Sequence, residues 1–262
     1  MSGTTVVQKR NIEMLDIIRA DVQMRYEAGF AWVNAASAML MLPNLRAGWT
    51  FASSDENGHV YDISGQGRII TNHNVVPFYK LALCNYADFT PASSHYFSRV
   101  DEAGLDILNG FTILSWVWFD VLGVAYAIGG KWLSAGNQRS YLLYKGVGNN
   151  IEFYISSLGT AASTISVISA STITTSKPHF VAGRFNPSTE LAVFLDNEKT
   201  ISVAGIPAAI FNSTAEYDVG AYENGTVAFI DGRITLMALC ATELTDAQIF
   251  SFYHWTRPLF GK

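Results

Sequence analysis

The chain has 262 residues, a formal net charge of −5 and 49% hydrophobic residues. Charged residues make up 15%, against about 25% in an average soluble protein. This composition excludes a disordered chain and predicts a sizeable core. The acidic balance offers no basic footprint, so nucleic acid is not expected as a partner. A surface this poor in charge indicates that part of it is covered in an assembly.

A helical arm is the first predicted element. Apolar residues recur at three- and four-residue spacing over residues 11–42, and Pro43 follows them. This period is typical of a helix, which a proline ends. The wide stripe favours docking on a partner or on a second copy, with packing on the chain's own domain as the alternative. The predicted assembly interface consists of Ile18, Val22, Tyr26, Phe30 and Val33.

The same region bears on localisation. Lys9 and Arg10 are followed by polar and acidic residues rather than by an apolar run, so no secretion signal is expected. Phe30–Leu42 is apolar but shorter than the roughly 20 residues that span a membrane. We therefore expect a protein made in the cytoplasm, without membrane insertion.

Beyond Pro43 the pattern changes to short alternating segments separated by Gly, Asn and Ser. Ten or more strands without helices between them favour a sandwich or jelly roll over a parallel sheet. A capping box at Thr245–Gln248 predicts a short final helix through about Tyr253. The predicted strands are Gly48–Phe51, Phe97–Val100, Phe111–Phe119, Tyr141–Lys145, Ile151–Ile155, Thr164–Ser169, His179–Phe185, Glu190–Leu195, Lys199–Val203, Tyr217–Tyr222 and Phe229–Leu239.

Two local patterns refine this prediction. Trp116 and Trp118 alternate with Val117 and Phe119, which predicts a strand that carries its indoles into the sandwich. Asp196-Asn197 stands where a hairpin needs a turn with positive φ. We divide the chain into a helical arm, residues 1–43, and a jelly-roll sandwich, residues 44–262, that ends in the short helix.

Several ordered segments carry a family resemblance over about residues 45–255. They are Leu45–Trp49, Val60–Gly67, Phe111–Val117, His179–Phe185, Ala192–Glu198, Phe229–Ile234 and Leu244–Ile249. Together they resemble the laminin-G-like, concanavalin A-like jelly roll. With the helical arm, the blocks Tyr61–Gly67 and Ser98–Asp106 are similar to virion-associated laminin-G-like proteins of phages and viruses.

Catalytic chemistry is not predicted. Asp196 with Glu198, and Glu216 with Asp218, have the spacing of two that places carboxylates on one face of a strand. The first pair falls on a hairpin turn, so we interpret all four as solvated turn or edge carboxylates, and we expect a non-enzymatic protein. Cys84 and Cys240 form no ligand cluster and are interpreted as buried thiols.

Calcium and carbohydrate remain as ligands to consider. The resemblance implies a calcium site at the sandwich rim, with Asp88 and Asp231 as its candidate ligands, although the loop at Asp88 departs from the usual pattern. A sugar site needs an exposed aromatic platform beside amide and acid groups. The candidates are Trp132, Asn137, Gln138 and Tyr222, with Tyr126 and Tyr144 as further rings.

The leading hypothesis is a non-enzymatic structural or decoration protein of a virion, on the head or in a fibre. The arm would attach or oligomerise it on other virion proteins or on itself, with a trimer as one possible state, and the jelly roll would be displayed. The alternative is a lectin-like module that binds cell-surface glycans. No cofactor is expected apart from calcium.

Overall fold

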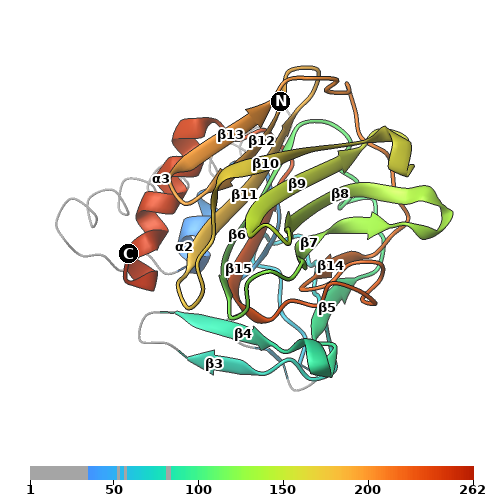
Figure 1. The fold of residues 1–262 in the computed structure, drawn as a ribbon. Helices are drawn as coiled ribbons and strands as arrows, with labels where there is room; N and C mark the ends of the chain where they lie inside the picture. Colours follow the sequence, from blue (N-terminus) through green and yellow to red (C-terminus); the bar gives the residue numbers. More distant parts are fainter. Residues whose placement is uncertain (1–34, 52–53, 56–57, 81–83) are drawn as a thin grey trace, which may run out of the picture.

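The computed structural model describes residues 35–51, 54–55, 58–80 and 84–262. In this part of the chain the strands form two antiparallel sheets that pack face to face (Figure 1). Side chains of alternating strands point to opposite faces, so each sheet presents one face to the other sheet and one face outward. This architecture confirms the predicted jelly-roll sandwich.

One sheet, which we call the helix-covered sheet, is built around β6, whose nine residues are all buried. Its strands lie in the order β13 (Glu198–Ser202), β12 (Glu190–Leu195), β11 (His179–Asn186), β6 (Phe111–Phe119), β15 (Gly232–Cys240), β4 (Asn85–Phe89) and β3 (Phe78–Lys80), and β1 (Leu45–Trp49) also pairs with β15.

The other sheet, which we call the open sheet, contains the long hairpin strands in the middle of the chain. Its order is β10 (Thr164–Thr172), β9 (Asn150–Ser156), β8 (Gln138–Lys145), β7 (Tyr126–Leu133), β14 (Tyr217–Val219), β5 (Tyr96–Arg99) and β2 (Thr71–His73).

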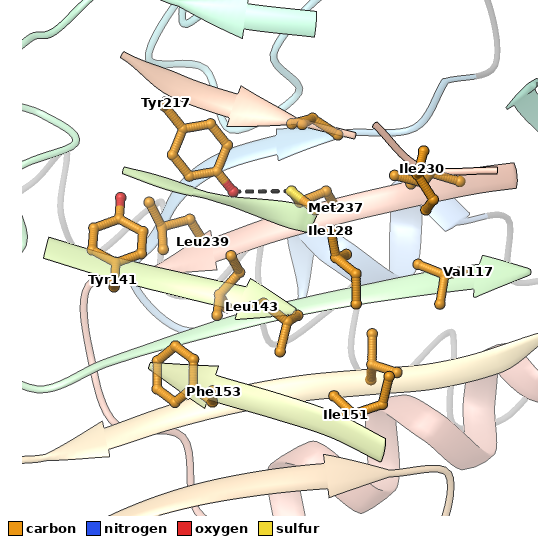
Figure 2. Close-up of a cluster of buried hydrophobic side chains, with 14 of the residues drawn as sticks. Val117, Ile128, Tyr141, Leu143, Ile151, Phe153, Tyr217, Ile230, Met237 and Leu239 are labelled. Atoms are coloured by element: carbon orange, nitrogen blue, oxygen red, sulfur yellow. Dashed lines mark hydrogen bonds between the residues drawn. The ribbon is translucent and has the colours of Figure 1, made fainter. Parts of the chain in front are cut away.

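The main core lies between the two sheets. Figure 2 shows Val117 and Met237 of the helix-covered sheet facing Leu143 and Phe153 of the open sheet. Tyr217 is fully buried among them, and its hydroxyl donates to Met237 Sδ at 2.9 Å. The buried hydroxyl therefore has a partner, as a polar group in an apolar core requires.

Helices cover the outer face of the helix-covered sheet. Figure 1 shows α2 (Ala35–Leu40) and α3 (Asp246–Thr256) together on this side of the sandwich. Thr245 and Gln248 form the predicted capping box at the start of α3. Short 3₁₀ turns complete the fold: η1 (Pro91–Ser93), η2 (Ala135–Asn137), η3 (Ala161–Ser163) and η4 (Arg257–Phe260). Among the described residues, no helix is both long and apolar enough to cross a membrane.

The placement of the indoles corrects one prediction. Trp116 and Trp118 point away from the sandwich interior. Trp116 belongs to a second cluster of buried residues, which the helix-covered sheet forms with α2 and α3. Val117 and Phe119 face the other sheet instead. The alternation was read correctly, but β6 is buried on both faces, so the pattern could not tell which face meets the other sheet.

Strand boundaries were predicted in part. β2, β3, β4 and β7 were not predicted; Gly129-Gly130 interrupts the apolar pattern of β7, and Asp88 that of β4. The strand predicted over Tyr217–Tyr222 ends at Val219, before Gly220 with a φ of +83°. Asp196 has the positive φ that the hairpin required, at +52°.

Candidate functional site: an aromatic face on the open sheet

The open sheet leaves an aromatic surface on its outer side. On β8 and β9, Leu143 and Phe153 face the core, so Tyr144, Tyr154 and Glu152 face outward. Tyr144 lies directly opposite Glu152 in the strand pairing. Because α2 and α3 occupy the outer side of the other sheet, this outward surface is the sheet face of the sandwich that no described α-helix covers.

Four rings form a continuous row on this surface, which we call the tyrosine face. Trp132 and Tyr154 have ring centroids 6.0 Å apart, Tyr154 and Tyr144 6.1 Å, and Tyr144 and Tyr222 6.1 Å. All three pairs are edge-to-face, a favoured geometry for aromatic rings. The rings rest on Ala127, Leu142 and Ala228. The row is therefore fixed by packing and exposes part of each tyrosine.

A strained loop carries Tyr222 to the row. Glu223, Asn224 and Gly225 all have positive φ, at +59°, +54° and +72°. Non-glycine residues in this region cost roughly 1 kcal/mol or more each, and such strain gathers at ligand sites. Two tethers hold the loop: Glu223 accepts from the Ser134 backbone N–H at 2.8 Å, and Asp218 accepts from the Gly225 N–H at 3.0 Å.

The tyrosines are neutral hydroxyl groups at physiological pH. Burial, with Tyr222 and Glu152 nearby, raises the pKa of Tyr144 to about 12. Burial and the hydrogen bond that Tyr154 donates to Glu152 raise the pKa of Tyr154 well above its usual value. Burial also raises the pKa of Tyr222; Glu223 adds to this rise, and Arg139 opposes it.

The structure brings together some of the predicted sugar-binding residues. Trp132 and Tyr222 both belong to the row, but Trp132 is only 8% exposed, so the accessible ring surface is that of the tyrosines. Asn137 is exposed in the β7–β8 turn, and Gln138 Oε1 accepts from the Thr214 N–H at 2.8 Å. Tyr126 faces the main core and is not available as a platform.

Sequence reasoning missed two residues of the face, Glu152 and Tyr154. The signal was present: Ile151, Phe153 and Ile155 alternate with them along one predicted strand. Assigning the apolar set to the core places the acid and the tyrosine outside, on the same face as Tyr144.

The two predicted calcium ligands, Asp88 and Asp231, lie near one another, and Arg233 pairs with Asp88 and with Asp120. Arg233 Nε lies 3.5 Å from Asp88 Oδ1, and its Nη1 lies 3.3 Å from Asp120 Oδ1. Burial raises the pKa of Asp231, and Asp120 raises it further. In the described ranges, no group of three or more His, Cys, Asp and Glu could hold a metal ion. The guanidinium of Arg233 thus supplies positive charge at this cluster.

The carboxylate pairs differ from their sequence interpretation. Asp196 Oδ2 lies 2.9 Å from His179 Nδ1 and 2.9 Å from Lys262 Nζ, so this carboxylate has two partners. Asp218 was predicted to be a solvated edge carboxylate, but it is only 1% exposed. The Tyr222–Ala228 loop closes over it.

Cys84 and Cys240 are free thiols, the first half-buried and the second buried.

The predicted assembly residues lie outside the described residues: Ile18, Val22, Tyr26, Phe30 and Val33. The described end of the arm packs on its own domain. Ala38 and Met39 of α2 are fully buried, and with Leu42 they join the cluster formed by α3 and the helix-covered sheet. Residues 35–42 therefore belong to the folded unit.

Comparison with known proteins identifies the class. A laminin-G family model, described as the concanavalin A-like lectin/glucanases superfamily, matches residues 92–250. This is more than half of the chain, and the chain belongs to that superfamily. None of the curated proteins matches it.

Solved structures share the fold at low sequence identity. The ligand-binding domain of botulinum neurotoxin serotype D, in complex with N-acetylneuraminic acid, matches with a TM-score of 0.61 and 13% identity over 83% of this chain and 52% of that one. The binding domain of botulinum neurotoxin serotype G matches with a TM-score of 0.60 and 14% identity, over 80% of this chain and 51% of that one. The binding domain of Paraclostridial Mosquitocidal Protein 1 matches with a TM-score of 0.60 and 12% identity, over 80% of this chain and 52% of that one. The chain thus spans about half the length of these structures.

Proposed function

We propose that this protein is a non-catalytic, lectin-like binding module whose tyrosine face binds glycans. The observation that carries the proposal is the row of partly exposed rings on the side of the open sheet that no described α-helix covers. Sugars stack their apolar faces on aromatic rings and exchange many hydrogen bonds with neighbouring polar groups. Glu152 provides a hydrogen-bond acceptor beside the row. At the Tyr222 end of the row, the Arg139 guanidinium provides a positive charge.

The rigidity of the face supports the same function. Each tyrosine contacts another ring of the row, so little side-chain freedom is lost when a ligand binds. Two structural neighbours are consistent with a binding role: one is in complex with N-acetylneuraminic acid and the other with rat synaptotagmin II.

Truncating the rings is expected to weaken glycan binding without unfolding the protein. Tyr144→Ala removes the central ring and should weaken binding at least 30-fold, equivalent to about 2 kcal/mol. Tyr222→Ala should weaken it about tenfold. The measurement is titration calorimetry with a glycan retrieved from a glycan array by the unmodified chain.

Tyr61→Ala is the matched control for both variants. Tyr61 is 54% exposed and lies outside the ring row, so the control should bind as the unmodified chain does. Equal affinity of the Tyr144 and Tyr61 variants would refute the assignment of the face. The absence of binding to any glycan on the array would refute the function.

A second proposal is that the module is a structural or decoration component of a virion, attached through its N-terminal arm. The observation that favours it is the disposition of the two surfaces. α2 packs on the outer side of the helix-covered sheet, and the tyrosine face lies on the outer side of the open sheet. Residues 1–34 precede α2 in the chain, so attachment through them would leave the tyrosine face turned outward.

Two truncations test the arm. The full chain should be an oligomer by light scattering, and residues 35–262 should form a folded monomer. A chain of residues 44–262 should lose about 2–4 kcal/mol of stability as well, because it lacks the buried Met39 and Leu42. A monomeric full chain would contradict an assembly role for residues 1–34.

A further inference from the structure

We propose that the tyrosine face selects uncharged glycans and that Glu152 is the residue that excludes acidic ones. This inference rests on the proposed glycan binding and specifies its ligand class. It starts from the position of Glu152, which is half-buried on β9 and lies directly opposite Tyr144 in the β8–β9 pairing. Its neighbour along the same face is Tyr154, so the carboxylate lies beside two rings of the row.

The carboxylate is held in place on two sides. The Tyr154 hydroxyl donates its proton to Glu152 Oε2. On the other side, Glu152 Oε1 packs against Gly146, where a Cβ would collide with it. The negative charge is therefore fixed at the face instead of swinging into solvent, and a ligand stacked on Tyr144 has to lie next to it.

Charge compensation at this position is absent among the described residues. Glu152 takes part in no ion pair there, in contrast to Glu190, which is paired with both Arg184 and Lys199. At the other end of the row, the charges of the Glu223 carboxylate and the Arg139 guanidinium lie near Tyr222 and shift its pKa in opposite directions. Glu152, Glu223 and Arg139 together supply two negative charges and one positive charge, which disfavours an anionic ligand.

Hydrogen-bond chemistry points the same way. A carboxylate only accepts, and the single Tyr154 proton is already donated to it, so the Glu152–Tyr154 pair presents acceptors to a ligand. Sugar hydroxyl groups can donate to these acceptors. A sialic or uronic acid carboxylate has no proton to donate at neutral pH, and it would add a like charge beside Glu152. Neutral hexoses and N-acetylhexosamines satisfy the site.

The test uses the full chain and a panel of matched glycans with and without a terminal N-acetylneuraminic acid. The unmodified protein is expected to bind the uncapped member of a pair at least tenfold more tightly than the capped one. Glu152→Gln keeps the acceptor for Tyr154 and removes the charge, so it should reduce this ratio to about threefold or less. Raising the salt concentration should also reduce the ratio, because screening weakens repulsion at the surface.

Glu198→Gln is the matched control, since it removes an exposed acid from β13 of the other sheet and should leave the ratio unchanged. Tighter binding of the capped glycans, or an unchanged ratio in the Glu152→Gln variant, would overturn the selectivity while leaving glycan binding established. If no glycan of either kind bound, and Tyr144→Ala therefore had nothing to weaken, the proposed function itself would fail.

Discussion

Trp116→Ala is expected to lower the free energy of unfolding by about 3–5 kcal/mol, the range typical of large buried aromatic side chains. Trp116 is fully buried between β6 and the C-terminal helix. Its ring stacks on Phe260 with centroids 4.2 Å apart and lies 5.8 Å from Tyr253. Its indole N–H donates to Thr256 Oγ1 at 2.8 Å. The substitution therefore removes packing and a buried hydrogen bond together.

The measurement is the urea unfolding midpoint, with Trp116→Phe as a milder variant. Phenylalanine keeps most of the packing, and Thr256 still donates to the Phe252 carbonyl, so this change should cost about 1–2 kcal/mol. Tyr61→Ala, on an exposed side chain, should stay within about 0.5 kcal/mol of the unmodified chain. A loss below about 1 kcal/mol for Trp116→Ala would contradict the role of the indole in joining helix and sheet.

Asp218→Asn is expected to stabilise the protein, and to do so increasingly as pH rises. Burial raises the pKa of Asp218 to about 8, with Glu216 and Glu223 adding to the effect and the Gly225 N–H opposing it. Its Oδ1 is buried without a hydrogen-bond partner among the described residues. The folded state therefore favours the protonated acid, which an asparagine resembles in shape and charge.

The sign follows from comparing the folded pKa with the unfolded value near 4. Below pH 4 the acid is protonated in both states, and Asp218 imposes no penalty. Between about pH 4 and 8 the unfolded state releases the proton that the folded state retains, so the unmodified chain loses stability as pH rises. Above about pH 8 the penalty stays constant. The asparagine variant should be more stable by about 5 kcal/mol at pH 8 and by nearly nothing at pH 3.5.

Thermal or urea unfolding across this pH range measures the difference. Glu243→Gln removes an exposed acid elsewhere and should give a flat difference between variant and unmodified chain. A stability difference for Asp218→Asn that did not change between pH 4 and 8 would mean that the side chain is solvated and that the Tyr222–Ala228 loop does not close over it.

Much of the sandwich could be predicted because its strands alternate regularly. The ranges Phe111–Phe119 and Glu190–Leu195 match observed strands, and the Thr245–Gln248 capping box lies at the predicted place. β7 was not predicted because Gly129-Gly130 interrupts its apolar pattern. In the structure, pairing with β8 and β14 on either side holds these glycines in the strand. Such support comes from residues distant in sequence, which a local pattern does not contain.

The site was predictable only in part, for a similar reason. Trp132 and Tyr222 were candidates, but periodicity places a ring on a face without saying which face is covered. Within the described part of the chain, α2 and α3 cover the outer face of one sheet and not that of the other, and this leaves Tyr144 and Tyr154 accessible. The burial of Asp218 depends on a loop with three consecutive positive φ values, and of these three residues Asn224 and Gly225 favour such values while Glu223 does not.

The most direct test of the account is nuclear magnetic resonance of the chain with isotopically labelled tyrosine, titrated with an uncapped glycan from the matched panel. We predict that the ring signals of Tyr144, Tyr154 and Tyr222 shift together and saturate, and that those of Tyr61 and Tyr79 do not move. Shifts confined to tyrosines away from the open sheet, or no shift in these three rings at saturating glycan, would contradict glycan binding by the tyrosine face.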